Sequence, residues 1–95
     1  MNERILNVKS AVYIGNYKLL VQFENGELRV ADLSDILTDD MGAFSELKDE
    51  NYFENKYSIL NGTIEWENGY DIAPDYLYRT SKPIQRKQLS QLAIS

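Results

Sequence analysis

Apolar and polar side chains alternate over the first third of the chain, a pattern typical of half-buried β-strands. In residues 17–23 (YKLLVQF), every second side chain is aromatic or aliphatic, and Lys18 falls on the opposite face. Residues 4–14 follow the same two-residue period, which predicts that Val12 faces the core, although Ser10 interrupts the pattern. Both segments are therefore predicted to be strands with one buried face.

Turn sequences separate these two strands from each other and from a third one. The pair Gly15-Asn16 suits a turn that needs positive φ, and the tripeptide ENG at 24–26 suits a hairpin connection. In the segment ELRVADL that follows, Leu28 and Val30 are predicted to point inward. The first third of the chain is thus expected to form a three-stranded antiparallel meander.

The spacing of apolar side chains lengthens to three and four residues between positions 32 and 57, which predicts short helices. Phe44 and Leu47 lie three apart, and Asp49 suits the start of a further helix that reaches Tyr57. We expect these helices to cover one face of the sheet and to hold their acidic residues in solvent.

The segment GTIEWENGYDIAPDYLY, residues 62–78, combines the signals of a strand, a turn and a helix. Its TIEWE stretch lies between two Asn-Gly pairs, which predicts a fourth strand with Ile64 and Trp66 on one face. Pro74 suits the first position of a helix, because its missing N–H would have no partner there. We predict that this segment is a structural latch that closes the fold. The residues assigned to the latch are Trp66, Gly69, Asp71, Pro74, Leu77 and Tyr78.

These elements predict one α+β domain over residues 1–80, in which a small antiparallel β-meander and a further strand are covered by short helices. Residues 81–95 are predicted to form a basic C-terminal tail. No apolar run approaches the roughly 18 to 20 residues of a membrane span. The first ten residues also lack the apolar stretch of a signal peptide. We therefore expect a cytoplasmic location without membrane association.

The chain contains neither cysteine nor histidine, which excludes thiolate nucleophiles, imidazole bases and the common zinc sites. Asp71 follows Glu65 and Glu67 closely, and such acids suit a carboxylate pair or a divalent-cation site. However, the two glutamates are expected on the sheet face opposite Trp66, and Asp71 is expected in a turn or cap. We therefore predict no catalytic residues, no metal, no cofactor and no enzymatic activity.

Four aromatic side chains of the latch region, Trp66, Tyr70, Tyr76 and Tyr78, have two interpretations. They suit an aromatic ligand cage or a platform for stacking bases, and they equally suit packing in and beside the core. Their match to strand and helix periods favours packing. No basic residue interleaves with them, which argues against nucleic acid.

Charge divides the chain into an acidic body and a basic end. Residues 1–78 hold all 15 acidic side chains and 6 basic ones, a net charge of 6 − 15 = −9. Residues 79–95 hold four basic side chains and no acidic one. These four are the predicted partner-binding residues: Arg79, Lys82, Arg86 and Lys87. Three interpretations of the tail stay open: a disordered end, a helix packed on its own acidic body or on a second copy, and a segment that folds on a partner.

At the latch, the sequence resembles DUF2442, a bacterial family of small domains of unknown function. The residues that carry the resemblance, which spans roughly residues 4–80, are Gly26, Asp32, Leu33, Gly42, Phe44, Leu47, Gly62, Thr63, Ile64, Trp66, Asn68, Gly69, Asp71, Pro74, Leu77 and Tyr78. The resemblance implies a small antiparallel sheet covered by short helices. It also implies relatives that carry a helix-turn-helix domain after this one, or that stand beside a gene for a small toxin-like partner. The 15 residues after Thr80 are too few for a helix-turn-helix domain.

We therefore expect a protein-interaction or regulatory module, an antitoxin-like partner of a small toxin-like protein, with self-association as the other protein contact. An acidic body suits a basic partner, because complementary charge speeds and selects association. The alternative is a nucleic-acid-linked transcriptional regulator that uses the basic tail. Four charges give only weak, salt-sensitive binding to nucleic acid.

Overall fold

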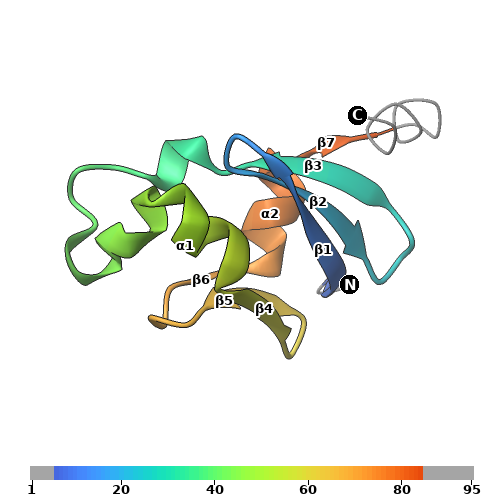
Figure 1. Cartoon of the computed structure of the whole chain (residues 1–95). Helices are drawn as coiled ribbons and strands as arrows, with labels where there is room; N and C mark the ends of the chain where they lie inside the picture. The colour runs from blue at the N-terminus through green and yellow to red at the C-terminus, as the bar shows by residue number, and fades with distance from the viewer. Residues whose placement is uncertain (1–5, 85–95) are drawn as a thin grey trace.

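The computed structural model describes residues 6–84, which form two antiparallel sheets with short helices beside them (Figure 1). The four-stranded sheet has the order β1 (Val8–Gly15), β2 (Lys18–Phe23), β3 (Leu28–Asp32) and β7 (Lys82–Pro83). The three-stranded sheet consists of β4 (Tyr57–Leu60), β5 (Thr63–Trp66) and β6 (Asp71–Ile72). Two 3₁₀-helices, η1 (Ser34–Ile36) and η2 (Gly42–Lys48), and two α-helices, α1 (Glu50–Asn55) and α2 (Pro74–Thr80), complete this part of the chain. The predicted α+β fold class is confirmed.

The meander of β1, β2 and β3 forms as predicted. Leu19, Val21 and Phe23 alternate along β2, and all three are fully buried. The prediction for Val12 is wrong, because this side chain is 56% exposed. A register shift after Val8 places one extra residue in β1. Such a β-bulge inverts which side chains face the core from that point on.

The inward face of β3 also differs from the prediction. Leu28 and Val30 do not face the core; Arg29 and Ala31 do, because they lie opposite the buried residues of β2. The turn before β3 sets this register, since the N–H of Phe23 donates to the carbonyl of Glu27 (3.0 Å). A shift of one residue moves every side chain of a strand to the other face.

The helical region is shorter than predicted. Asp49 caps α1 as expected, with its carboxylate accepting a hydrogen bond from the N–H of Asn51. The prediction that the helix reaches Tyr57 is wrong: α1 ends at Asn55, and Tyr57 begins β4. The Asn61-Gly62 turn explains the difference. Both turn residues have positive φ (51° and 78°), and such a turn joins two antiparallel strands directly.

The buried apolar side chains form one core between the two sheets and the helices. Its members are Val8, Leu19, Val21, Phe23, Ala31, Leu33, Leu47, Phe53, Ile64, Trp66, Ile72 and Leu77. Figure 1 shows α2 running behind the four-stranded sheet and above the small one, so this helix joins the two halves of the fold. The helix begins at Pro74, as predicted. Ile72 before its cap and Leu77 in its second turn are both buried, which suits a hydrophobic staple.

The fold continues past the predicted domain boundary at residue 80. Ser81 is buried, and Lys82 and Pro83 pair with β3 as the edge strand β7. The N–H of Ile84 then donates to the carbonyl of Leu28 (3.0 Å). The first residues assigned to the tail are therefore part of the sheet, whereas residues 85–95 lie outside the described part of the chain. No helix among residues 6–84 is long and apolar enough to cross a membrane.

Candidate interaction surface

The helical region between β3 and β4 carries a dense set of exposed carboxylates, here called the acidic layer. Its members are Asp35, Asp39, Asp40, Glu46, Asp49, Glu50 and Glu54, and all of them are exposed. Residues 34–55 contain Lys48 as their one basic residue, so this region has a net charge of 1 − 7 = −6. Most of the negative charge of the body is thus concentrated on one structural region.

Four acids of the acidic layer have partners within the fold. Asp49 caps α1, Asp39 pairs with Lys48 (3.2 Å), and Glu46 accepts a hydrogen bond from the side-chain amide of Asn68 (3.2 Å). Glu50 accepts a hydrogen bond from the Tyr13 hydroxyl. Burial, followed by this hydrogen bond, raises the pKa of Tyr13 and keeps the phenol protonated as a donor.

The other three acids of the layer, Asp35, Asp40 and Glu54, make no ion pair or side-chain hydrogen bond within residues 6–84. A carboxylate of this kind adds to the surface potential and contributes little to the fold. These three residues are therefore free to pair with basic groups of another molecule.

The structure describes two of the four predicted partner-binding residues. Arg79 lies on α2 and pairs with Asp75 at 3.8 Å, with both side chains well exposed. Lys82 lies on β7 and lines a hollow of about 210 Å³ with Lys18, Val30, Asp32 and Thr80. Arg86 and Lys87 lie outside the described residues.

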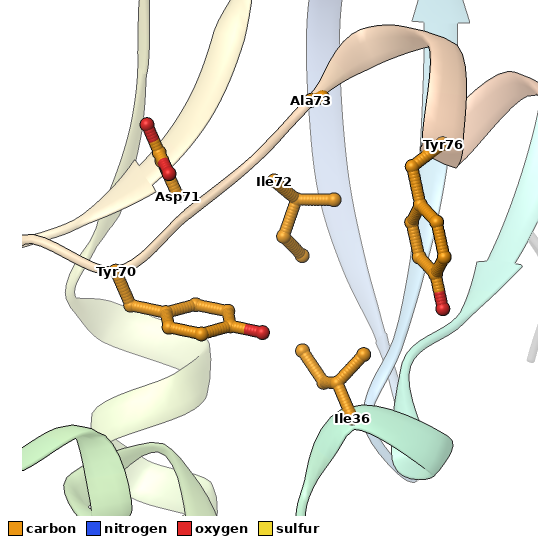
Figure 2. A pocket seen from close by; sticks show the side chains of 6 residues that line it. All are labelled: Ile36, Tyr70, Asp71, Ile72, Ala73 and Tyr76. Atoms are coloured by element: carbon orange, nitrogen blue, oxygen red, sulfur yellow. The ribbon is translucent and has the colours of Figure 1, made fainter. Parts of the chain in front are cut away.

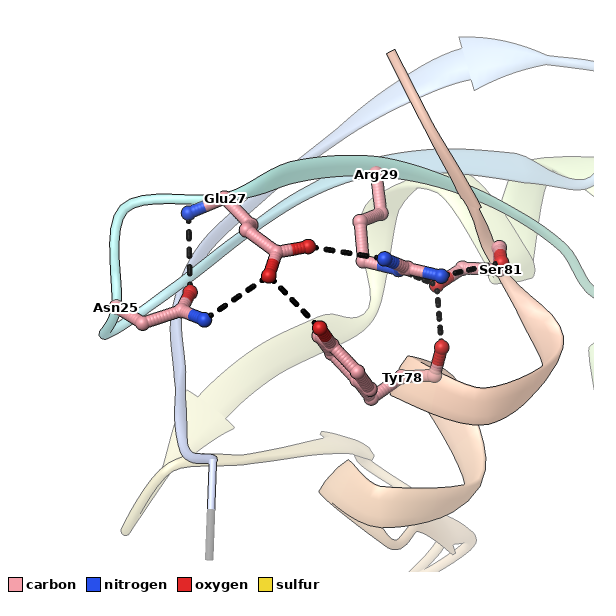
Figure 3. Close-up of polar contacts among 5 residues, drawn as sticks. All are labelled: Asn25, Glu27, Arg29, Tyr78 and Ser81. Carbon is pink, nitrogen blue, oxygen red and sulfur yellow. Dashed lines mark hydrogen bonds and ion pairs between the residues drawn. The ribbon is translucent and has the colours of Figure 1, made fainter. Parts of the chain in front are cut away.

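A partly buried polar cluster ties α2 to β3 (Figure 3). The Arg29 side chain, 13% exposed, donates from Nε to Ser81 Oγ (2.8 Å) and from Nη2 to the Ser81 carbonyl (2.9 Å). Its third contact, from Nη1, is with Glu27 (2.9 Å). The guanidinium carbon also lies 4.2 Å from the ring centroid of Tyr78, whose hydroxyl donates to Glu27 (2.7 Å). Tyr78 of the predicted latch therefore contacts Arg29 directly and shares Glu27 with it as a hydrogen-bonding partner.

The inward position of Arg29 was not predicted from the sequence. Because Leu28 and Val30 were expected to face the core, Arg29 between them was expected to face solvent. A signal for it exists in the hairpin sequence. If Glu27 is taken as the partner of the buried Phe23, the two-residue period continues inward through Arg29. An arginine at an inward position needs hydrogen-bonding partners. This requirement would have indicated that the polar residues at the end of α2 lie beside Arg29.

The polar cluster shifts the pKa of two of its members in opposite directions. The hydrogen bond from Tyr78, followed by that from Arg29, lowers the pKa of Glu27. The same bond to Glu27, followed by burial, raises the pKa of Tyr78. Both shifts favour the ionised carboxylate and the neutral phenol over the neutral pH range.

Acidification is expected to destabilise the wild-type protein more than a Glu27→Gln variant. A carboxylate whose pKa is lowered by folding stabilises the fold above its unfolded-state pKa, and this stabilisation is lost as the pH falls through the folded-state pKa. The measurement is thermal unfolding by circular dichroism from about pH 7 to about pH 3. An equal loss of stability in both proteins over that range would show that the Glu27 contacts do not favour the folded state.

The other latch residues take up structural positions. Trp66 is 1% exposed, and its Nε1 donates to the carbonyl of Phe53 (3.0 Å). Gly69 has a φ of 96° in the turn between β5 and β6, a conformation that favours glycine. Asp71 is exposed, and strand pairing places it opposite Glu65. Glu65 lies on the face of β5 away from the buried Trp66, as predicted. The prediction that Asp71 lies in a turn or cap is wrong, because this residue pairs with Glu65 as the first residue of β6.

A pocket of about 310 Å³ lies between η1 and the corner that joins β6 to α2 (Figure 2). Its walls are Ile36, Tyr70, Asp71, Ile72, Ala73 and Tyr76. Figure 2 shows the Tyr70 ring and the Tyr76 hydroxyl directed toward Ile36, whereas the Asp71 carboxylate points away from these side chains. Burial, with smaller contributions from Tyr76 and Asp71, raises the pKa of Tyr70. The pocket therefore offers apolar walls and the neutral phenol of Tyr70.

Some of the aromatic side chains of the latch region pack in the core, and others line this pocket. Trp66 packs against Phe53 at 5.1 Å between ring centroids, and Tyr78 packs edge-on against Phe23 at 5.3 Å. Tyr70 contacts Phe44 at 5.2 Å and also lines the pocket. Packing is thus the role of the indole, as predicted, and the pocket suits an apolar group of modest size.

Comparison with family models gives a match over most of the chain. The family model described as "Protein of unknown function (DUF2442)" matches residues 8–83, from the start of β1 to the end of β7. No curated protein and no solved structure matches the chain. The matched range includes the polar cluster and β7, so the family pattern extends past residue 80 to the edge strand.

Proposed function

We propose that this chain, which belongs to the DUF2442 family, is a non-enzymatic protein-interaction module whose acidic layer binds a basic partner. The observation that carries the proposal is the concentration of seven exposed carboxylates and one lysine within residues 34–55. This layer lies on short helices anchored by the buried side chains of Leu47 and Phe53. The charge is thus held on a structured surface.

The arrangement of these carboxylates suits the binding of a basic protein better than it suits catalysis. A field of one sign raises the rate at which an oppositely charged partner associates, and it repels acidic competitors. Catalysis by carboxylates needs two of them directed into a shared cleft. The acids of the layer instead point to solvent on η1, η2 and α1 and on the loop between the 3₁₀-helices.

The partner class follows from the sequence resemblance as well as from the charge. A small toxin-like protein of basic surface charge fits both, and the chain would then serve as its antitoxin-like partner in the cytoplasm. Nucleic acid is a poor match to the acidic layer, because phosphates carry the same sign of charge. Arg79, one of the four basic residues of the C-terminal end, also has an acidic neighbour, Asp75, within 4 Å.

The test compares two triple variants of the full chain in capture experiments from a native lysate, scored by mass spectrometry. The first is Asp35→Asn, Asp40→Asn and Glu54→Gln, which removes the acids of the layer that have no partner in the fold. The matched control removes the same charge elsewhere. It consists of Glu24→Gln, Glu65→Gln and Asp71→Asn. Truncation at residue 80 is unsuitable, because it would remove Ser81 and with it the partner of Arg29.

We expect the wild type and the control variant to retain the same basic partner, and the layer variant to lose it. Removal of three charges from an electrostatically steered interface is expected to slow association by about 10-fold at low salt. Equal retention by both variants would contradict the proposal. Recovery of nucleic acid, with no protein, would support the regulator alternative.

A further inference from the structure

The face of the four-stranded sheet that points away from the core is apolar along a row that crosses three strands. Strand pairing places Val12 opposite Leu20, and Leu20 opposite Val30. Leu28 lies two residues before Val30 in β3, so its side chain points to the same face of the sheet. These four side chains are here called the outer face.

The outer face is not part of the core. Val12 is 56% exposed, and the other three side chains are partly exposed. Within residues 6–84, none of the four packs against the core cluster. Helix α2 covers the opposite face of the sheet, where Tyr78 packs on Phe23. A contiguous group of apolar side chains that is partly exposed in this way is a candidate docking surface.

The chain itself leads to this surface. Figure 1 shows β7 at the edge of the sheet beside β3. The next residue, Ile84, is still bonded to Leu28 of the outer face (3.0 Å between N and O). The eleven residues 85–95 therefore start at the border of the outer face.

We propose that residues 85–95 dock on the outer face through their apolar side chains, Leu89, Leu92 and Ile94. The reach of the segment is sufficient. Two strand spacings, from β3 to β1, amount to about 10 Å, whereas eleven residues span about 16 Å as a helix and at most about 36 Å when extended. The segment also contains no acidic residue.

Tethering favours this segment over a second copy of the chain. A short covalent connection to β7 gives the apolar side chains of the segment an effective concentration near the face in the millimolar range. A second copy would have to compete at its much lower free concentration. The inference does not depend on the proposed function, because the outer face and the acidic layer lie on different elements of the fold.

A nitroxide at the end of the chain tests the contact. The chain has no cysteine, so a Ser95→Cys substitution in the full-length protein provides a single labelling site. Docking is expected to broaden the methyl NMR signals of Leu20 and Val30 in the labelled protein. Reduction of the nitroxide should restore them.

Two pairs of variants connect the broadening to the proposed contact. On the segment, Leu92→Asp removes an apolar anchor, and Ser90→Asp introduces the same charge as a control. On the sheet, Val12→Asp changes the outer face, and Leu60→Asp changes an equally exposed apolar position on β4 (51% exposed). We expect the first variant of each pair to abolish the broadening at Leu20 and the second to preserve it.

Three results would overturn the inference. The first is the absence of broadening at Leu20 and Val30 in the labelled protein. The second is broadening that survives both Leu92→Asp and Val12→Asp. The third is broadening at Leu20 in an isotope-enriched copy without nitroxide that is mixed with nitroxide-labelled protein at natural isotope abundance, because this would assign the outer face to a second chain.

Discussion

Replacement of Trp66 with alanine is expected to lower the free energy of unfolding by about 3 to 5 kcal/mol, the range for truncation of a large buried aromatic side chain. The indole lies between Phe53 and Tyr57, at centroid distances of 5.1 and 6.0 Å, and is 1% exposed. Its Nε1 also donates a hydrogen bond to the backbone carbonyl of Phe53 (3.0 Å). The loss would therefore loosen the contact between α1 and the small sheet.

Urea unfolding followed by far-ultraviolet circular dichroism measures this loss, since the variant has no other tryptophan for fluorescence. A Trp66→Phe variant serves as the control, because it keeps an aromatic ring and removes the hydrogen bond to Phe53. We expect it to lose about 1 to 3 kcal/mol. An alanine variant as stable as the wild type would show that the latch does not depend on the indole.

Replacement of Arg29 with methionine is expected to lower the free energy of unfolding by about 2 to 3 kcal/mol, within the range for hydrogen bonds to a charged group. Methionine keeps the apolar stem and removes the donors to Glu27 and to both oxygens of Ser81. The contact with the Tyr78 ring is lost as well. Because Ser81 leads directly into β7, the edge strand is expected to separate from β3.

An Arg79→Met variant is the matched control for this measurement. Its arginine pairs with Asp75 at 3.8 Å on the surface of α2, with side chains 65% and 74% exposed. Exposed pairs of this kind contribute about 0 to 1 kcal/mol. If both methionine variants unfolded at the same urea concentration, the cluster around Arg29 would have no more stabilising role than an ordinary surface ion pair.

The elements whose signals are local could be predicted from the sequence. The alternation of β2, the cap at Asp49 and the helix start at Pro74 each depend on a few adjacent residues. The match of residues 8–83 to the DUF2442 model is consistent with the resemblance drawn from the latch segment. These features describe how single elements begin, end and face the core.

The errors arose where pairing between strands decides the outcome. Neither the bulge after Val8 nor the register of β3 can be read from one strand alone, because each depends on which residue lies opposite. Tyr57 has helical spacing from Phe53, but the turn at Asn61-Gly62 pairs it with Trp66 in β4. Tertiary pairing thus overrides a local helical preference.

These same errors concealed the surfaces of functional interest. If Val12 and Val30 faced the core, there would be no outer face, and if Arg29 faced solvent, there would be no polar cluster. The acidic layer, in contrast, follows from the sequence, because short helices rich in acids expose most of them. The sequence predicted the charge of the body, and the structure locates its densest part on residues 34–55.

Hydrogen exchange of the full chain, alone and in complex with its captured partner, tests the central claim most directly. If the acidic layer is the binding surface, the amides of residues 34–55 gain protection in the complex and those of β4 and β5 do not. Protection confined to the outer face, or to α2 and β7, with residues 34–55 unchanged, would contradict the claim and place the partner elsewhere.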